Sequence, residues 1–384
     1  MPKIESIQIC TVRVPLSHVT SFSTRQIAAR DYTLVKLRSI DGVEGLGFCY
    51  AGSTGGRVVT AAAVELLAPK LVGRDSHAVA AVWDELYQEA LLHGRTGAVM
   101  RALSALDTAL WDLNARSVGL PLYKYLGAAL ESDTVPAYAS GGYYSDGKTP
   151  EMLGEEMASY VVQGFRAVKM KVGRGRLDEE EARVRTARAA IGSDVFLMLD
   201  ANNAWNDLPT ALAYLRRFAR YDPYWIEEPF APDDIENHAR LARTTPVTVV
   251  TGEIEAGRWR FKELLDKGAA AILQTDALVC GGVSEWRIIA ATAASYGVSM
   301  CPHWFHDVHI HLVASTVNGQ YVEFFPDDQV LNFRLLIDRQ VEVRGGALVL
   351  PQRPGLGFNF DEIAVERYAL ERRHADVWQI TTTR

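Results

Sequence analysis

Eight short β-rich segments recur roughly every 20 to 30 residues from about residue 134 onward, with helix-like stretches between them. Such spacing is typical of βα units that form a parallel sheet. Eight units predict a closed barrel of the TIM type. An open doubly wound sheet is the alternative, but no GxGxxG motif opens a helix after the first strand. The segments are TVPAYAS, FRAVKMKV, VFLMLD, YWIEE, VTVVTGE, AAILQTD, GVSMCPH and YVEFF.

The residues before this pattern predict a separate α+β region, because 384 residues are too many for one ordinary core. Strand-like segments come first, with a hairpin turn at Asp41-Gly42. Near the end of the chain, a second hairpin is expected around Gly345-Gly346, and the tail beyond it should pack on the first domain. Helical periodicity is expected over 56–72, 77–93 and 96–118.

Composition and charge exclude several classes of protein. The net charge of −7, without a long basic run, argues against a nucleic-acid or anionic membrane partner. The first residues carry charges and no apolar core of a secretory signal, and no stretch of about 18 apolar residues predicts a membrane span. The four cysteines are scattered, so we expect free thiols and a cytoplasmic protein.

Charged side chains end the β-rich segments one after another. The carboxyl ends of parallel barrel strands meet at one mouth, where the active sites of such barrels lie. Charges at strand ends can also simply mark where the chain reaches water. That explanation fits poorly for Asp200, Glu227 and Glu253, which end apolar runs on three consecutive strands. The complete set is Lys169, Lys171, Asp200, Glu227, Glu228, Glu253, Asp276, His303 and Glu323.

Three carboxylates that converge at one mouth repel one another, and they persist most easily around a cation. Carboxylate oxygens, with water and substrate completing the shell, suit Mg²⁺. Zinc would favour histidine and cysteine, which these positions lack. We therefore predict a Mg²⁺ site formed by Asp200, Glu227 and Glu253.

Two lysines, Lys169 and Lys171, share one face of their segment, because side chains alternate along a strand. A solvent-exposed edge strand decorated with lysine is the ordinary explanation. In a barrel the same face points into the mouth, where cationic neighbours can lower the pKa of a lysine towards neutrality. Asp276 and His303 end adjacent strands and predict a pair in which the carboxylate orients the imidazole. A lysine and a histidine would then face a substrate from nearly opposite sides.

Several ordered motifs of this chain resemble the enolase superfamily, in its mandelate racemase subgroup. They are VKMKVG, LMLDANNAW, WIEEP, VTGE, LQTDALVCGGVSE and CPHWF, together with the helix-like segment 102–127, and they cover nearly the whole chain. The resemblance implies an α/β fold, with a (β/α)7β barrel and an α+β capping domain formed by the N-terminal part and the C-terminal tail. We place the capping domain at 1–128, the barrel at 129–345 and the returning segment at 346–384.

The resemblance also implies a chemistry, the Mg²⁺-dependent removal of the proton alpha to a carboxylate to give a metal-stabilised enediolate. Asp200, Glu227 and Glu253 would be the metal ligands, with Glu228 behind them. Lys171 would be one acid/base, and His303, paired with Asp276, the other. The resemblance further implies that Lys169 contacts Lys171 and the substrate carboxylate. Glu323 would contact an enediolate oxygen, and Asn202 would contact the substrate.

The same site can dehydrate, racemise, epimerise or cycloisomerise, depending on what the second acid/base does. The segment Ser17–Gln26 reads as a hydroxyl-rich loop over the mouth, with His18 and Arg25, and it favours a polyhydroxylated acid, although loops are polar in general. We therefore predict a dehydratase of an aldonate or aldarate, with a racemase, epimerase or lactone cycloisomerase as the alternative. A third class, a catalytically inactive barrel that serves as a binding or structural protein, would lack at least one catalytic group, and none is missing from this sequence.

The residues after His303 are expected to line the pocket, namely Trp304, Phe305 and His306. The spacing of His306, His309 and His311 can suggest a metal, but these residues fall where a helix should start, and we interpret them as pocket wall and helix face. The expected partner is a small-molecule carboxylate, with no nucleic acid and no membrane, and we expect a homo-oligomer.

Overall fold

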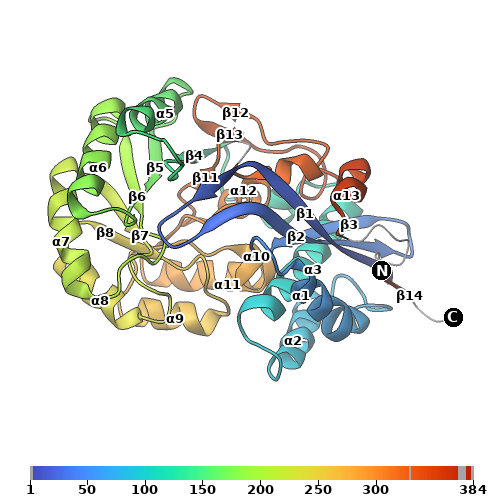
Figure 1. Cartoon of the computed structure of the whole chain (residues 1–384). Helices are drawn as coiled ribbons and strands as arrows, with labels where there is room; N and C mark the ends of the chain where they lie inside the picture. The colour runs from blue at the N-terminus through green and yellow to red at the C-terminus, as the bar shows by residue number, and fades with distance from the viewer. Residues whose placement is uncertain (1–2, 328–329, 371–377, 382–384) are drawn as a thin grey trace.

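The computed structural model describes residues 3–327, 330–370 and 378–381. Two sheets organise this part of the chain, one antiparallel and one mainly parallel (Figure 1). The antiparallel sheet has the strand order β14-β1-β2-β3. Its strands are β1 (Ile4–Ser21), β2 (Gln26–Ser39), β3 (Glu44–Tyr50) and β14 (Trp378–Thr381).

Helix α3 (Gly97–Ser117) packs closely on this sheet because β3 carries two glycines. A Cβ atom at Gly47 would lie 1.9 Å from the carbonyl oxygen of Ala105, and one at Gly45 would lie 2.4 Å from that of Ala109. Only glycine permits this approach. All three expected helices are present, the first broken into α, π and 3₁₀ turns. The other elements are α1 (Gly56–Ala61), η1 (Ala62–Leu67), η2 (Ala68–Lys70), α2 (Val79–Ala90) and α4 (Leu122–Tyr125).

Eight parallel strands of the described chain form a ring. From β4 to β10 each strand pairs with the next in sequence, and β11 pairs with β4. The ring closes between β10 and β11 because Met300 bonds through its backbone to Asn318 and Gln320. The strands are β4 (Thr134–Ser140), β5 (Ala167–Lys171), β6 (Phe196–Asp200), β7 (Pro223–Glu227), β8 (Thr248–Thr251), β9 (Ile272–Leu273), β10 (Ser299–Met300) and β11 (Val322–Phe324).

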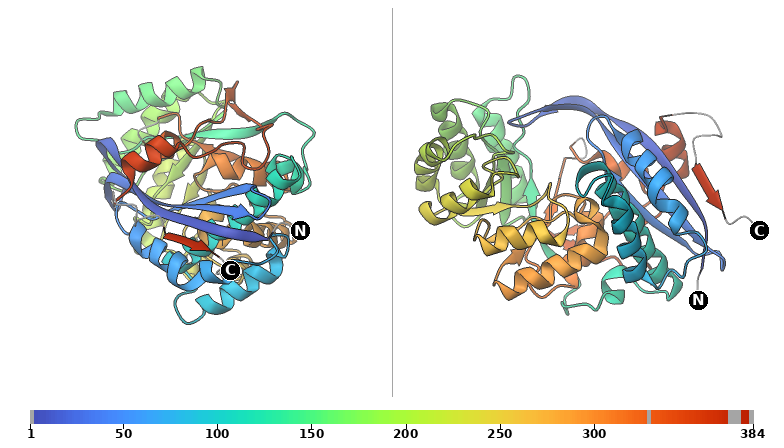
Figure 2. Two further views of the ribbon diagram at one scale, coloured as in Figure 1. Left: turned by 90° about the vertical axis from the view of Figure 1, so that its right-hand side faces the viewer. Right: turned by 90° about the horizontal axis from the view of Figure 1, so that it is seen from below.

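Helices cover the outside of this ring (Figures 1 and 2). One helical segment or more follows each strand up to β10, which gives the predicted (β/α)7β order of the TIM-type barrel. The helices are α5 (Pro150–Val162), α6 (Leu177–Ile191), α7 (Leu208–Phe218), η3 (Ala219–Tyr221), α8 (Ile235–Thr244), α9 (Arg258–Asp266), α10 (Ala277–Cys280), α11 (Gly282–Ser295) and α12 (His306–Ala314).

The lysine-bearing face of β5 points into the barrel. Val168 and Met170 join the apolar cluster between strands and helices, whereas Ala167 joins the cluster inside the ring. Lys169 and Lys171 are only 1% and 5% exposed, and β5 is hydrogen-bonded to β4 on one side and β6 on the other. The alternative of a solvent-facing edge strand is therefore wrong.

After the barrel, the chain returns to the antiparallel sheet. The hairpin expected around Gly345-Gly346 is present as β12 (Val343–Arg344) and β13 (Ala347–Val349), and β13 pairs with β4. β14 then pairs antiparallel with β1, so the capping domain contains both the N-terminal part and the C-terminal tail. The boundaries at 1–128, 129–345 and 346–384 stay predictions. The remaining elements are η4 (Asn332–Leu336) and α13 (Glu362–Tyr368).

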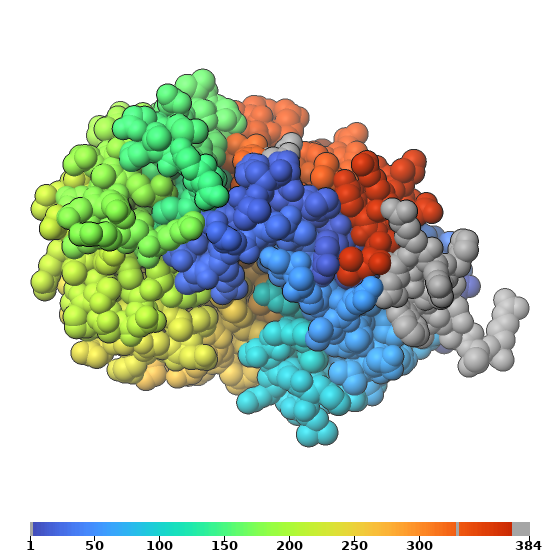
Figure 3. All heavy atoms as spheres, viewed as in Figure 1, coloured from blue at the N-terminus to red at the C-terminus, as the bar shows by residue number. Residues whose placement is uncertain are grey.

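The β1–β2 hairpin reaches from the capping domain to the barrel (Figures 1 and 2). The expectation of a loop over Ser17–Gln26 is wrong, because β1 continues to Ser21 and β2 begins at Gln26, which confines the turn to residues 22–25. Backbone hydrogen bonds between Ser21 and Tyr144 tie the hairpin to the segment after β4. In Figure 3 the blue hairpin packs directly against the green surface of the barrel.

Two further observations bear on the sequence predictions. Among the described helices, none has the length and apolar character that a membrane crossing requires. The four cysteines carry free thiols, and three of them are buried.

Candidate active site

Three carboxylates from neighbouring strands meet at the carboxyl end of the barrel. Asp200 ends β6, Glu227 ends β7, and Glu253 follows β8. One oxygen of each lies within 4.8 Å of the others, and all three side chains are buried. The Oε2 atoms of Glu227 and Glu253 have no hydrogen-bond partner among the described residues. Two buried acceptors therefore point to something outside the described chain.

The electrostatics of this group favour a cation. Burial raises the pKa of Glu227 well above its usual value, and repulsion from Asp200 adds to the effect. Burial and the neighbouring Glu228 raise the pKa of Glu253 to about 8. Burial would also raise the pKa of Asp200, but Lys171 and Lys169 hold it below its usual value. An all-oxygen donor set of acids fits Mg²⁺, and it lacks the nitrogen and sulfur donors that zinc favours.

The two lysines of β5 contact these acids. Nζ of Lys169 lies 2.6 Å from Oε1 of Glu227 and 2.8 Å from Oε1 of Glu323, and Nζ of Lys171 lies 2.5 Å from Oδ2 of Asp200. Burial alone would lower the pKa of both lysines, but the neighbouring carboxylates raise it above the usual value. The sequence predicted that Lys169 and a metal ion together would lower the pKa of Lys171. Among the described groups, Asp200 and the other neighbours that raise this pKa together outweigh burial and the repulsion from Lys169.

His303 faces the same acids from the β10 side of the ring. Its Nδ1 lies 3.1 Å from Oδ2 of Asp276, and its Nε2 lies 3.5 Å from Oε1 of Glu253. Burial alone would lower the pKa of His303, but Glu253 and Asp276 raise it to about 9. The structure thus brings together the Asp276–His303 pair, and the imidazole holds a proton that it can donate.

The histidines that follow are structural. In His309, Nδ1 lies 3.0 Å from the carbonyl oxygen of Trp304, and Nε2 accepts a hydrogen bond from the backbone N–H of Ala277 at 3.0 Å. A carbonyl only accepts and a backbone N–H only donates, so both ring nitrogens of His309 have a structural partner. The cavity between the barrel mouth and the capping domain is not lined by Phe305, His306 or His311, which are buried elsewhere. The expectation that Phe305 and His306 line the pocket is therefore wrong.

Glu323, on β11, lies between the lysines and His303. Its Oε2 accepts a hydrogen bond of 2.8 Å from the backbone N–H of Trp304. Burial would raise the pKa of Glu323, but Lys169 and His303 hold it below its usual value. An ionised carboxylate accepts hydrogen bonds, and it can donate one to an enediolate oxygen only after taking up a proton. The role implied for Glu323 stays a prediction.

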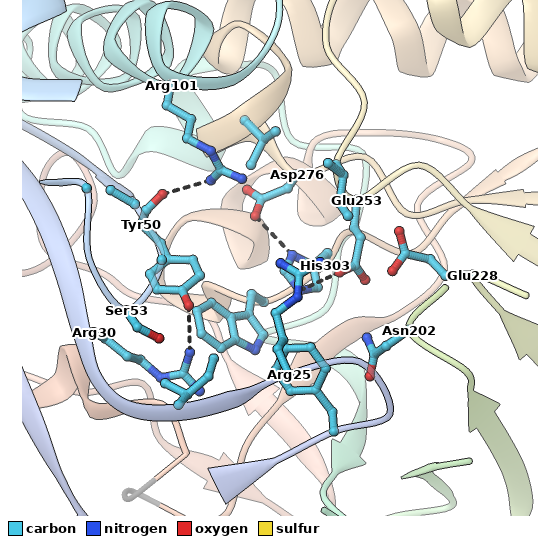
Figure 4. Close-up of a pocket in the computed structure, with 18 of the residues that line it drawn as sticks. Arg25, Arg30, Tyr50, Ser53, Arg101, Asn202, Glu228, Glu253, Asp276 and His303 are labelled. Carbon is cyan, nitrogen blue, oxygen red and sulfur yellow. Dashed lines mark hydrogen bonds and ion pairs between the residues drawn. The ribbon is translucent and has the colours of Figure 1, made fainter. Parts of the chain in front are cut away.

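A cavity of about 460 Å³ lies between the barrel mouth and the capping domain (Figure 4). The three residues predicted to bind substrate, Asn202, Arg25 and Trp304, all line it. Glu228 lines it as well, although the resemblance placed this residue behind the metal ligands. The acid/base candidates that reach the cavity are Lys171, His303, Asp276 and Glu323.

Unusual backbone conformations gather at this mouth. Four of the five described non-glycine residues with positive φ lie here, with φ of +45° at Asn202, +64° at Asn203, +43° at Glu228 and +59° at Trp304. Such conformations cost roughly 1–3 kcal/mol each and cluster at functional sites. The strain therefore marks the mouth independently of its charges.

The capping side of the cavity contains residues that the sequence did not single out, namely Arg30 on β2, Tyr50 on β3 and Arg101 on α3. An arginine on a strand or helix gives no local sign that it faces a cavity, because only the packing of the capping domain on the barrel puts it there.

The hydroxyl groups of the β1–β2 turn bind the barrel backbone. Oγ of Ser23 donates to the carbonyl oxygen of Ala201, and Oγ1 of Thr24 donates to that of Asn202. His18 is exposed and does not line the cavity. The hydroxyl-rich character of this segment therefore holds the hairpin in place, and it is weaker support for a sugar substrate than the sequence suggested.

Comparison with known proteins places this geometry among related enzymes. The profile "Mandelate racemase / muconate lactonizing enzyme, N-terminal domain" matches residues 4–127, and the profile "Enolase C-terminal domain-like" matches residues 152–364. L-talarate/galactarate dehydratase from Salmonella typhimurium is 34% identical over 94% of this chain and 88% of its own length. Arabinonate dehydratase from Saccharolobus solfataricus is 33% identical over 79% of this chain and 82% of its own length.

A cycloisomerase is also among the relatives. The 3,6-anhydro-alpha-L-galactonate cycloisomerase from Streptomyces coelicolor is 31% identical over 96% of this chain and 99% of its own length. The crystal structure of the Salmonella dehydratase, liganded with Mg and L-lyxarohydroxamate, matches with a TM-score of 0.90 and 30% identity, over 99% of this chain and 95% of that one.

Proposed function

Because the chain belongs to the mandelate racemase and muconate lactonizing enzyme family, we propose that it removes the proton alpha to a carboxylate and eliminates water from a sugar acid, leaving a 2-keto-3-deoxy acid. The observation that carries this proposal is the position of Lys171 and His303, which line one cavity from β5 and from the end of β10 beside the three acids. Two acid/base groups on two sides of one substrate are what an elimination needs.

The metal of the proposed enzyme is Mg²⁺, held by Asp200, Glu227 and Glu253. Their converging oxygens and the unpartnered Oε2 atoms of Glu227 and Glu253 support this assignment. When bound, Mg²⁺ supplies positive charge that stabilises the dianion left after proton removal. Sharing of Asp200 with a cation would also weaken its ion pair with Lys171, which frees this lysine for proton transfer.

The proton steps fall to the chain's own residues. Lys171 or His303 takes the alpha proton, and His303 gives a proton to the hydroxyl leaving the beta carbon, which departs as water. The resulting enol tautomerises to the 2-keto acid. Asp276 orients the imidazole through the 3.1 Å contact with Nδ1. Lys169, flanked by Glu227 and Glu323, supplies a fixed positive charge to the developing oxyanion.

Dehydration is proposed ahead of the other outcomes because relatives over most of this chain are named as dehydratases of sugar acids. A lactone cycloisomerase is the second candidate, since one relative over 96% of this chain carries such a name. Asn202, Arg25 and Trp304 complete the proposal as substrate-binding residues, since all three line the cavity.

We also propose that the protein is cytoplasmic and forms a homo-oligomer. Light scattering after gel filtration measures its oligomeric state.

The proposed reaction is tested with a panel of aldonates and aldarates in D₂O with Mg²⁺. Semicarbazide should detect a 2-keto acid from at least one of them, with deuterium incorporated at carbon 3. A racemase or epimerase would instead exchange the alpha proton and invert the centre without forming a keto acid. Inversion or lactone opening in place of keto acid would show that the choice of dehydration is wrong.

The Glu227-Glu228 pair gives a separate prediction. Glu227→Gln should weaken Mg²⁺ binding and turnover more than Glu228→Gln, because Glu227 belongs to the converging group and also holds Lys169. Isothermal titration with Mg²⁺ and steady-state kinetics measure the two effects. The two variants serve as each other's matched control, and the reverse order would mean that the second acid is the ligand.

A further inference from the structure

We infer that Arg30 and Arg101 bind a second carboxylate at the end of the substrate remote from the metal ligands, so that the preferred substrate is an aldarate. This inference rests on the proposed function and narrows its substrate class. The two arginines line the same cavity as Lys171 and His303. Figure 4 shows Arg30, Tyr50, Ser53 and Arg101 on one side of this cavity, and Asn202, Glu228 and Glu253 on the other.

The capping side of the cavity is positively charged throughout. The described residues that line it from the capping domain include three arginines and no aspartate or glutamate. Among the described residues, no carboxylate forms an ion pair with Arg25, Arg30 or Arg101. Arg13, in contrast, pairs with Asp31 through two hydrogen bonds of 2.7 and 3.0 Å.

Arg30 and Arg101 are held in place by neutral groups. Arg30, 1% exposed, donates from Nε to the carbonyl oxygen of Val330 and lies over the ring of Trp304 at 4.3 Å. Arg101 donates from Nη1 to the carbonyl oxygen of Tyr50 at 2.8 Å. These contacts fix the two guanidinium groups without neutralising them. A buried charge without a counter-ion is costly, and an anionic ligand would remove that cost.

The acids on the barrel side do not serve these arginines. Asp276 is paired with His303, and Glu323 with Lys169. Glu253 faces His303 and belongs to the group that fits Mg²⁺. These three acids are therefore engaged at the reacting end of the substrate, and Glu228 lies on the side of the cavity opposite Arg30 and Arg101 (Figure 4), so these two arginines are left for the other end.

A carboxylate fits the capping side better than a phosphate. Gly52, Ser53 and Gly55 line the cavity, but the backbone N–H of Gly56 donates to Oδ2 of Asp31 at 3.0 Å and is therefore not available to a phosphate. Planar guanidinium groups match the planar carboxylate, to which each can donate two parallel hydrogen bonds.

The test compares hexarates with hexonates of the same configuration at carbons 2 to 5, using the Mg²⁺-loaded full chain. Loss of a charge-assisted hydrogen bond is worth about 10- to 100-fold. The kcat/KM for the best hexarate should exceed that for its matched hexonate by at least about 10-fold. In Arg101→Gln this ratio should fall about 10-fold or more, mainly through KM of the hexarate. Arg101 is half-buried, so the Tm of this variant shows whether it still folds.

Arg166→Gln is the matched control, because Arg166 is exposed and precedes β5 at the end of the barrel remote from the mouth. The ratio of kcat/KM for the hexarate to that for the hexonate should be the same in Arg166→Gln as in the wild type. A hexonate turned over to keto acid as well as its hexarate would overturn the second-carboxylate site and leave the proposed dehydration intact. Preference for a 6-phosphorylated hexonate would overturn the carboxylate as the bound group. If no sugar acid of either kind gives keto acid, the proposed function itself fails, and this inference fails with it.

Discussion

Turnover is expected to fall by about 10²- to 10⁴-fold in Lys171→Met, and by a similar factor in His303→Asn, because each variant removes one general acid–base group. Methionine keeps the length and the apolar stem of Lys171 while it removes the amine that contacts Asp200. Asparagine keeps a donor near Asp276 and removes the titrating ring. The measurement is kcat and kcat/KM on the substrate found in the D₂O panel.

Lys262→Met is the matched control for the lysine variant, since Lys262 is exposed and pairs with Asp266 on the outside of the barrel. It should keep wild-type turnover. Thermal unfolding of each variant separates loss of chemistry from loss of the fold. A folded Lys171→Met or His303→Asn protein with turnover within about 10-fold of the wild type would contradict the assigned role of that residue.

The two variants should also differ in what they retain. If Lys171 takes the alpha proton and His303 delivers one to the leaving hydroxyl, His303→Asn should still exchange the alpha proton with D₂O. Lys171→Met should lose exchange and dehydration together. ¹H NMR of the recovered substrate measures exchange directly. Exchange in Lys171→Met but not in His303→Asn would reverse the two roles and leave the two-sided site intact.

The barrel could be predicted from the sequence because its signals are local. Each strand is a short apolar run, and each run ends in a polar residue at the same edge of the sheet, so the order of Asp200, Glu227 and Glu253 along the chain already implied their convergence. Alternation along β5 likewise predicted that Lys169 and Lys171 share a face. Which way that face points depends on the pairing of β5 with both neighbours, which no local pattern reports.

The parts that sequence reasoning missed depend on contacts between distant segments. Arg30 and Arg101 reach the cavity only because the capping domain lies over the barrel mouth. The hydroxyl-rich segment Ser17–Gln26 favoured a polyhydroxylated substrate, yet the hydroxyls of Ser23 and Thr24 bind the backbone of residues 201 and 202. The pKa of Lys171 was expected to fall because of two cationic neighbours, Lys169 and a metal ion. Asp200, 29 residues away in sequence, decides the direction instead.

Removal of the metal is expected to abolish activity completely. Dialysis against EDTA should reduce turnover to background, and Mg²⁺ should restore it, since the dianion formed by proton removal needs the cation beside it. Asp200→Asn should lose both Mg²⁺ binding and activity. Because Asp200 also holds Lys171, activity alone cannot identify it as a ligand, and the binding isotherm is the decisive measurement.

Stability gives a readout of the same site that does not depend on catalysis. Glu227 and Glu253 are buried beside Asp200, and burial already raises the pKa of both, so relief of their repulsion should stabilise the folded state. A ligand present at 100 times its Kd adds about 2.7 kcal/mol to the free energy of unfolding. Mg²⁺ should therefore raise Tm in the wild type and leave it unchanged in Asp200→Asn. An active protein free of metal, or a Tm that Mg²⁺ raises equally in both proteins, would show that these three acids serve the fold and not a cation.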